Sequence, residues 1–210
     1  MSILSTYFDK VYCINLARRP ERWETVQTVF NELGFDEVER YEAIDGKTLD
    51  YLKDFKNSKH LSLGSLGIMQ SHFNILNEAK KNKYKTILIT EDDVYFSNKI
   101  KDLKLYMDSV PDDWDMIYFG GSHDHGKPTT KINDKIIKLG RTVSIHCVAI
   151  KNTIYDKLLD IAENRTRSID AYYADLHPII NAYGFVPSIA FQTEGYSDIA
   201  NQIVNYNRFF

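Results

Sequence analysis

The sequence predicts an α/β protein, with a mostly parallel central sheet and helices on both of its faces. Residues 86–90 form an almost continuous apolar run, which is typical of a strand covered on both sides. Strand-like runs alternate with segments of helical periodicity along the chain, as in strand–helix–strand units. No internal repeat, linker or low-complexity segment interrupts this alternation. We therefore expect residues 1–210 to form a single domain, with a core from about residue 8 to residue 200.

The first half of the chain carries ordinary start and stop signals. Residues 11–15 form a short β-prone run, and Pro20 suits the first turn of a helix. Apolar residues then recur at helical spacing until Gly34, a residue that commonly follows helix C-termini. Residues 38–44 look extended and end at an Asp-Gly turn signal at residues 45–46.

The remaining elements follow from the same patterns. Residues 47–64 are polar and predict a loop with a short helical piece, and residues 65–80 carry a helical apolar stripe that leads into strand 86–90. The expected elements after that strand are a helix at 98–109, a strand at 115–119, a loop at 122–134, a strand at 142–150, helices at 153–163 and 169–183, and a strand at 185–191.

Composition narrows the functional classes. The formal charge is −3, and no basic stripe is present, which argues against a general nucleic-acid binder. Cys13 and Cys147 lie in apolar runs, as small buried residues of a reducing compartment do. No segment reaches the ~20 apolar residues that span a bilayer, and the first ten residues lack an apolar signal core. We expect a cytoplasmic protein with no membrane span.

Three consecutive acids, Glu91, Asp92 and Asp93, follow the apolar strand 86–90 directly. Open α/β sheets place their ligands at the carboxyl ends of strands. Three carboxylates at such a place repel each other and lose hydration, so they need a positive partner. A divalent cation that also holds an anionic substrate is one explanation, and an acidic surface turn is the other.

Two further polar clusters also follow predicted strands. Arg18, Arg19 and Arg22 come after strand 11–15, where forked guanidinium groups and free helix N–H groups could hold phosphates. The alternative is a solvated helix start with Arg–Glu pairs. The other cluster is the corner at residues 120–124, whose His123 and neighbours could close over a ligand or simply form a glycine-flanked loop tip.

Taken together, the motifs resemble glycosyltransferase family 25, which includes bacterial lipooligosaccharide galactosyltransferases and the collagen galactosyltransferases. The similarity covers nearly the whole chain, and its strength lies in the order of individually weak motifs. The matching segments are residues 11–23, 42–46, 64–72, 91–94, 169–170, and Gln192 followed by residues 197–199.

The resemblance implies a GT-A fold and a metal-dependent, inverting transferase. Its donor would be a UDP-sugar carrying a hexose such as galactose or glucose, and its acceptor a hydroxyl of a glycan or protein. The cofactor would be Mn²⁺ or Mg²⁺, since carboxylates and water suit hard cations. A leaving nucleoside diphosphate develops negative charge that a cation stabilises, and inversion needs one base beside the acceptor hydroxyl.

The resemblance also implies roles for single residues. Asp92 and Asp93 would bind the metal, and Asp170 would be the catalytic base; the alternative for Asp170 is a first-turn acid that complements the helix dipole. For His72 the alternative is a hydrogen-bonded core residue. The donor-binding residues would be Asn15, Leu16, Arg18, Arg19, Asp45, His72, Glu91, Asp92 and Gln192.

The chain departs from the family pattern at Met69, Gln70 and Thr90, which leaves the acids intact but makes donor and acceptor preference uncertain. Because the chain is compact, we expect acceptor recognition from loops near 47–63 and 122–134. Two other functions stay open. One is an inactive relative that binds nucleotide sugars or glycans; the other is a metal-dependent phosphohydrolase.

Overall fold

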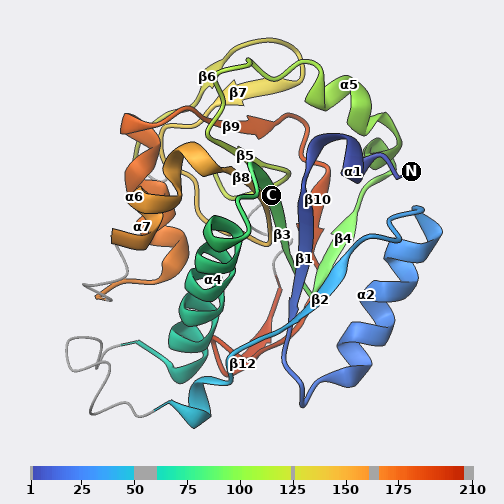
Figure 1. The fold of residues 1–210 in the computed structure, drawn as a ribbon, viewed down its shortest axis with the longest axis vertical. Coiled ribbons are helices and arrows are strands. Elements are labelled where there is room, and N and C mark those ends of the chain that lie inside the picture. The colour runs from blue at the N-terminus through green and yellow to red at the C-terminus, as the bar shows by residue number, and fades with distance from the viewer. Residues whose placement is uncertain (1, 50–60, 124–125, 161–165, 206–210) are drawn as a thin grey trace.

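The computed structural model describes residues 2–49, 61–123, 126–160 and 166–205 (Figure 1). Within these residues, one continuous sheet of eight strands forms the centre of the molecule. In spatial order its strands are β2 (Glu39–Glu42), β1 (Lys10–Asn15), β3 (Thr86–Glu91), β8 (Cys147–Lys151), β5 (Met116–Tyr118), β9 (Ala182–Phe185), β7 (Ile136–Lys138) and β6 (Thr130–Lys131).

Most strands of this sheet run in the same direction. β2 and β3 both pair with β1 in parallel, and β5 pairs with β9 in parallel. β8 lies antiparallel between β3 and β5, and β7 lies antiparallel between β9 and β6. Of the eight strands in this sheet, β8 and β7 therefore run in the direction opposite to the other six. The α/β class and the mostly parallel sheet predicted from the sequence are confirmed.

Helices cover both faces of the sheet (Figure 1). Successive residues of β1 alternate between the faces: Tyr12 and Ile14 belong to one core, and Val11 and Cys13 to the other. The first core is covered by α4 (Leu63–Lys81), α6 (Tyr155–Asp160) and α7 (Ile169–Leu176). The second is covered by α1 (Leu4–Tyr7), α2 (Pro20–Glu32) and α5 (Leu103–Met107).

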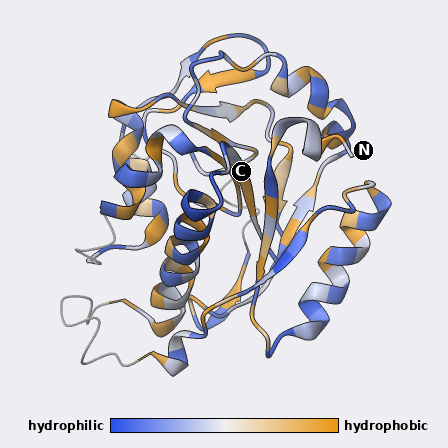
Figure 2. Ribbon diagram, in the orientation of Figure 1, coloured by the Kyte–Doolittle hydropathy of each residue, from blue (hydrophilic) through white to orange (hydrophobic). Residues whose placement is uncertain are grey.

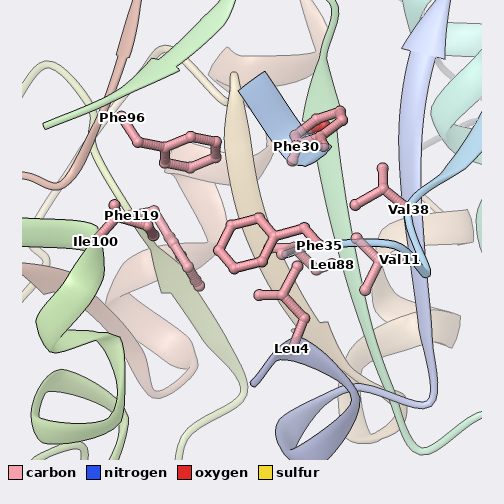
Figure 3. Close-up of a pocket in the computed structure, with 10 residues that line it drawn as sticks. Leu4, Val11, Phe30, Phe35, Val38, Leu88, Phe96, Ile100 and Phe119 are labelled. Atoms are coloured by element: carbon pink, nitrogen blue, oxygen red, sulfur yellow. The ribbon is translucent and has the colours of Figure 1, made fainter. Parts of the chain in front are cut away.

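The second core is a packed apolar layer. Hydrophobic and hydrophilic residues alternate along helices such as α2, as expected for helices that turn one face to a sheet (Figure 2). Figure 3 shows the ring of Phe35 at the centre of this layer, with Leu88, Leu4 and Phe119 around it. The apolar space between these side chains leaves no room for a water molecule. This region therefore stabilises the fold and is not a ligand site.

Two small antiparallel sheets lie outside the main one. β4 (Val94–Phe96) pairs with β10 (Ala190–Gln192), and β11 (Gly195–Ser197) pairs with β12 (Gln202–Val204) to form a hairpin. The 3-10 helices are η1 (Gly46–Thr48), η2 (Asn98–Asp102), η3 (Asn152–Ile154) and η5 (His177–Ile179). Neither small sheet was expected from the sequence.

Several predicted boundaries are wrong in the second half of the chain. The helix expected at 169–183 ends at Leu176, because Pro178 disfavours continued α-helix before it, and Ala182 already starts β9. The strand expected at 185–191 is split into the end of β9 and β10, since Pro187 cannot donate a ladder hydrogen bond.

Other predicted elements are shorter than expected. The strand expected at 142–150 begins only at Cys147, because Ser144 has a backbone φ of +68°. The helix expected at 98–109 consists of η2 followed by α5. Of the helix expected at 153–163, residues 161–163 lie outside the described residues. Two residues of the loop expected at 122–134 form β6.

Cys13 and Cys147 are buried and unpaired in β1 and β8, as the sequence predicted. No helix in the described part of the chain is long and apolar enough to cross a membrane.

The N-terminal part of α4 packs directly on the turn that follows β2. A Cβ atom added to Gly67 would lie 2.4 Å from the carbonyl oxygen of Ile44 and 2.9 Å from the nitrogen of Gly46. Both are backbone atoms, which cannot move aside as the end of a flexible side chain can. Glycine at position 67 therefore allows the helix to hold the turn that carries Asp45.

The variant Gly67→Ala should lower the free energy of unfolding by about 1–3 kcal/mol, the usual cost of forcing an extra methyl group into a packed site. The control is Gly195→Ala, where an added Cβ atom would meet no atom within 4 Å. Urea unfolding of the two variants and the parent protein measures the difference. Equal unfolding midpoints for all three proteins would contradict the close approach of α4 to the turn.

Candidate active site

A cavity of about 790 Å³ lies at the carboxyl ends of β1 and β3; we call it the edge cavity. Open α/β sheets commonly bind ligands at this edge. Its lining comes from the residues that follow β1, β2 and β3, from the beginnings of α4 and α7, and from the β11–β12 hairpin. The segments that line it include Ala43–Lys47, Ser62–Ser65, Glu91–Asp93, Ser144–Ile145, Ser168–Asp170 and Tyr196–Gln202.

Asp92 is held in place on both of its carboxylate oxygens. Oδ2 accepts a hydrogen bond of 2.6 Å from Nδ2 of Asn15, and Oδ1 lies 2.9 Å from Nη1 of Arg22. Asn15 is itself fixed, since its Oδ1 accepts from Nε and Nη2 of Arg40 at 2.9 and 2.6 Å. The last residue of β1 thus positions an acid that follows β3.

Asp93 keeps one carboxylate oxygen without a partner. Its Oδ2 lies 3.5 Å from Nε2 of Gln192 and 3.6 Å from Nη2 of Arg22. Its main-chain oxygen accepts from the amide and the hydroxyl of Thr193, at 2.8 and 3.1 Å. Oδ1, however, is buried and makes no hydrogen bond with any residue that the structure describes. A buried, unpartnered carboxylate oxygen in a cavity is a ready ligand for a cation.

Burial disfavours the charged forms of these acids. Burial raises the pKa of Asp93 to about 6, with a further contribution from Asp92, although Arg22 and Gln192 oppose the shift. Burial also raises the pKa of Asp92, against Arg22 and Asn15. The pKa of Glu91 lies well above its ordinary value because of burial and the charges of Asp93 and Asp92. The cluster is therefore under-compensated without a cation.

The raised pKa values predict how stability changes with pH. Because the folded, metal-free protein holds protons that the unfolded chain has lost between about pH 4 and pH 6, its free energy of unfolding falls as pH rises through this window. Asp93→Asn removes the group with the orphaned oxygen, so this variant should lose less stability over that range. Urea unfolding in a chelator at several pH values tests this, and equal slopes for variant and parent would contradict it.

The donor set fits a hard cation that a substrate completes. In the described part of the chain, no three His, Cys, Asp or Glu side chains are arranged to hold a metal ion by themselves. Mg²⁺ and similar cations are often held by one or two carboxylates together with substrate phosphates and water. Asp93, with its orphaned oxygen, and Asp92 beside it meet that requirement.

Asp170 reaches the edge cavity from the first turn of α7. Its Oδ1 accepts from the amide of Ala171 at 2.8 Å, and its Oδ2 accepts from the amide of Ser144 at 3.4 Å. It lines the cavity on a different element from Asp92 and Asp93. The structure is compatible with both interpretations of Asp170 from the sequence. It is an acid in the first turn of a helix, and it lines the cavity where a substrate would lie.

The β11–β12 hairpin is tied to the basic turn after β1. Arg18 lies 2.6 Å from Asp45 through Nε and 2.9 Å from Asp198 through Nη2. Ser62 donates a hydrogen bond of 2.8 Å to the carbonyl of Ile199. The guanidinium of Arg19 lies over the ring of Tyr196, 5.7 Å from its centre. These contacts hold residues 196–202 as one wall of the edge cavity.

The sequence matches the model of one protein family over most of its length. The model of glycosyltransferase family 25, described as an LPS biosynthesis protein, matches residues 8–176. This chain belongs to glycosyltransferase family 25. The resemblance predicted from the ordered motifs is confirmed, and the matched segment contains the basic turn, the acids after β3, and Asp170.

Several curated relatives of the chain come from animals. The chain is 30% identical over 152 residues to a glycosyltransferase 25 family member of Drosophila melanogaster, covering 63% of this chain and 24% of that protein. It is 32% identical over 130 residues to procollagen galactosyltransferase 1-A of Xenopus laevis, covering 54% and 21%. Procollagen galactosyltransferase 2 of Homo sapiens is 31% identical over 130 residues, covering 54% and 21%. The match thus spans about a quarter or less of these relatives.

Most predicted site residues of this family 25 chain line the edge cavity. They are Leu16, Arg18, Asp45, Glu91, Asp92, Asp93, Asp170 and Gln192. Arg22, which the sequence placed in the basic turn without a separate role, also lines it and pairs with both Asp92 and Asp93. The residues that follow the predicted strands thus meet around one cavity.

Asn15, Arg19 and His72 do not line the cavity, so the structure does not bring these three predicted donor-binding residues to it. Asn15 is buried and acts on Asp92, as described above. Arg19 contacts the hairpin. His72 is fully buried, with Nδ1 3.1 Å from the hydroxyl of Tyr173, and burial lowers its pKa to about 3. It is a neutral core residue between α4 and α7, the alternative considered from the sequence.

The expected acceptor loops are placed only in part. In the 47–63 segment, Lys47, Ser62 and Leu63 line the edge cavity, and residues 50–60 lie outside the described residues. Among the described residues of 122–134, none lines it; His123 contacts the hydroxyl of Thr142 at 2.9 Å instead. Residues 124 and 125 lie outside the described residues.

Two groups of lining residues had no role assigned from sequence. Ser144 and Ile145 precede β8, and most of the β11–β12 hairpin lay in a segment with no periodic signal. The only available signal for the hairpin was the Ser-Asp-Ile motif at 197–199. No sequence pattern marks Ser144, whose position depends on its backbone φ of +68°.

Proposed function

We propose that this chain is a metal-dependent, inverting glycosyltransferase domain. It moves a hexose, galactose or glucose, from a UDP-sugar to a hydroxyl group of a glycan or protein. The observation that carries the proposal is the buried, unpartnered Oδ1 of Asp93 in a cavity that also contains Arg18 and Arg22. Relatives named procollagen galactosyltransferase support galactose as the first sugar to test.

The donor side of the proposal rests on charge and size. A volume of about 790 Å³ falls within the usual range for small-molecule sites. Asp92 and Asp93 would hold Mn²⁺ or Mg²⁺, which, when bound, neutralises charge that develops on the leaving diphosphate. Guanidinium groups supply forked hydrogen-bond donors suited to phosphate oxygens. The arginine that faces both acids, Arg22, is placed to serve this role.

The acceptor side assigns Asp170 as the base. In a single displacement, the acceptor oxygen bonds to the anomeric carbon of the sugar while the bond from that carbon to the diphosphate breaks. Asp170 takes the proton that the acceptor hydroxyl loses. The amides of Ala171 and Ser144 hold the carboxylate in place, so its position is fixed before a substrate arrives.

A donor-hydrolysis and transfer assay tests the proposal. Purified protein is incubated with a panel of nucleotide sugars, with Mn²⁺ or with chelator, and release of nucleoside diphosphate is measured. We expect release from UDP-galactose or UDP-glucose only with the cation, and an increase when a glycan or collagen-like peptide acceptor is added. Product stereochemistry is read by NMR of the new linkage.

Other outcomes would contradict the proposal in distinct ways. Free phosphate from simple phosphate esters would indicate a phosphohydrolase. Tight binding of UDP-sugars without any turnover would indicate a binding module that retains the family fold. Retained anomeric configuration in the product would overturn the single displacement at Asp170.

A further inference from the structure

We infer that Arg22 stands in for the metal in the unliganded protein and moves to the donor diphosphate when the cation binds. This side chain then adds to the mutual strengthening of cation and nucleotide binding that direct contact between them supplies. The inference rests on the proposed function, because it concerns the same cation and the same donor. The new element is the role of Arg22, which exchanges the acids Asp92 and Asp93 for the donor diphosphate.

The geometry of Arg22 places it across the acidic pair. Nη1 lies 2.9 Å from Oδ1 of Asp92, and Nη2 lies 3.6 Å from Oδ2 of Asp93. The two nitrogens of one guanidinium thus engage two different carboxylates. Its side chain is 23% exposed, whereas those of Asp92 and Asp93 are 9% and 11% exposed. Arg22 therefore approaches the acids from the more open side of the site.

Other cations of the basic turn do not share this position. Arg18 pairs with Asp45 and Asp198, and Arg19 with Glu21 and Asp198. Among the described residues, the ion pairs of Asp92 and Asp93 within 4 Å all come from Arg22. The charge that compensates the buried acids in the absence of metal is thus concentrated in one side chain.

A divalent cation and this guanidinium compete for the same two carboxylates. A cation bound to Asp92 and Asp93 would lie within a few ångströms of Arg22, where repulsion between like charges is strong in a partly buried site. The ion pair of Arg22 with Asp93 uses Oδ2, so the orphaned Oδ1 of Asp93 stays available as a ligand for the cation. A diphosphate gives Arg22 an alternative anionic partner. When Arg22 moves to the diphosphate, both acids are free to bind the cation.

This exchange predicts positive coupling between the two ligands. Mn²⁺ alone should bind weakly because it must displace Arg22 without compensation, and UDP alone should bind weakly because Arg22 is engaged with the acids. When both ligands are present, UDP accepts the guanidinium that Mn²⁺ displaces, and Mn²⁺ replaces the guanidinium at the acids that UDP draws away. Because coupling between two binding sites is reciprocal, Mn²⁺ must tighten UDP by the same factor as UDP tightens Mn²⁺.

Isothermal titration calorimetry measures the coupling with MnCl₂ alone, UDP alone, and each in the presence of the other. In the parent protein we expect mutual enhancement of roughly tenfold or more, within the usual range for coupled sites. In Arg22→Gln, Mn²⁺ alone should bind roughly tenfold more tightly than in the parent, and the enhancement by UDP should fall roughly tenfold, to the part that direct contact between cation and diphosphate supplies. Arg22→Lys should fall between the two, since one ammonium group cannot span both acids.

Arg141→Gln is the matched control. Arg141 pairs with Asp175 at 3.3 Å, its side chain is 22% exposed, and it does not line the edge cavity. This variant should show the affinities and the enhancement of the parent. Thermal unfolding without ligands shows that each variant is folded, and Arg22→Lys retains a charge beside the acids if Arg22→Gln fails to fold.

The possible failures are distinguishable. If the parent binds MnCl₂ and UDP with strong mutual enhancement, and Arg22→Gln keeps both the parent's Mn²⁺ affinity and its enhancement, the exchange at Arg22 is overturned while the proposed donor site stands. If the parent binds neither probe, the proposed function and this inference fail together.

Discussion

Replacing Asp93 with asparagine is expected to abolish Mn²⁺-dependent UDP binding and to lower kcat/KM for sugar transfer by about 10³-fold or more. Asparagine keeps the volume of the side chain and one oxygen but removes the negative charge. A cation that stabilises a leaving diphosphate contributes several kcal/mol, and about 1.4 kcal/mol corresponds to a factor of ten in rate. Loss of its main ligand, whose Oδ1 is the orphaned oxygen, should remove most of that contribution.

The control for this variant is Asp108→Asn. Asp108 is an exposed acid that pairs with Lys104 and accepts a hydrogen bond from Tyr7, and it does not line the edge cavity. It should leave donor binding and transfer unchanged. Steady-state kinetics with UDP-galactose and calorimetry with UDP and Mn²⁺ give both quantities. If Asp93→Asn retained more than about a tenth of the parent's activity at the same Mn²⁺ concentration, the assignment of Asp93 as the main ligand would be wrong.

Replacing Asp170 with asparagine should have a different signature. We expect kcat for transfer to fall by about 10² to 10⁴-fold, the usual contribution of a general base. Calorimetric affinity for UDP with Mn²⁺ should stay close to that of the parent, because Asp170 lies on another element, α7, and its carboxylate is bonded to the amides of Ala171 and Ser144. The two variants thus separate loss of chemistry from loss of donor binding.

Asp175→Asn provides a control on the same helix. Asp175 pairs with Arg141 and Arg167 and does not line the edge cavity, so its loss tests the general effect of removing an acid from α7. Transfer by this variant should match the parent. A similar fall in kcat for Asp170→Asn and Asp175→Asn would show that helix stability, and not proton transfer, explains the effect.

The acidic part of the site was predictable because its signals are local. An apolar run followed by three acids places Glu91, Asp92 and Asp93 at a strand end without any knowledge of the rest of the fold. The same argument placed Leu16 and Arg18 after β1. Since β1 and β3 are adjacent parallel strands, their following residues meet at one edge, as expected.

The second half of the site depended on contacts between distant segments. Nothing in the local pattern shows that β8 is reversed between β3 and β5, which brings Ser144 beside Asp170. Likewise, the position of the β11–β12 hairpin depends on the ion pair between Arg18 and Asp198, which lie far apart in the chain. Such pairings are set by the packed fold and are not visible in a short window of sequence.

His72 shows why the direction of a side chain is hard to predict on a helix that is buried on several sides. Gly67, Ser71 and His72 are all buried on α4, and they contact different neighbours: the turn after β2 for Gly67 and Ser71, and Tyr173 for His72. Helical spacing alone does not separate these directions. The segment 64–72 therefore lies on a helix, as expected, but the pattern did not show that His72 turns toward Tyr173 and not toward the edge cavity.

A crystal structure of the protein with UDP and MnCl₂, with anomalous data at the manganese absorption edge, would show directly whether Asp93 holds the cation. We expect a manganese peak in contact with Oδ1 of Asp93, a diphosphate in the edge cavity, and the guanidinium of Arg22 turned from the acids toward that diphosphate. Manganese bound away from Asp93, or UDP bound outside the edge cavity, would contradict this expectation.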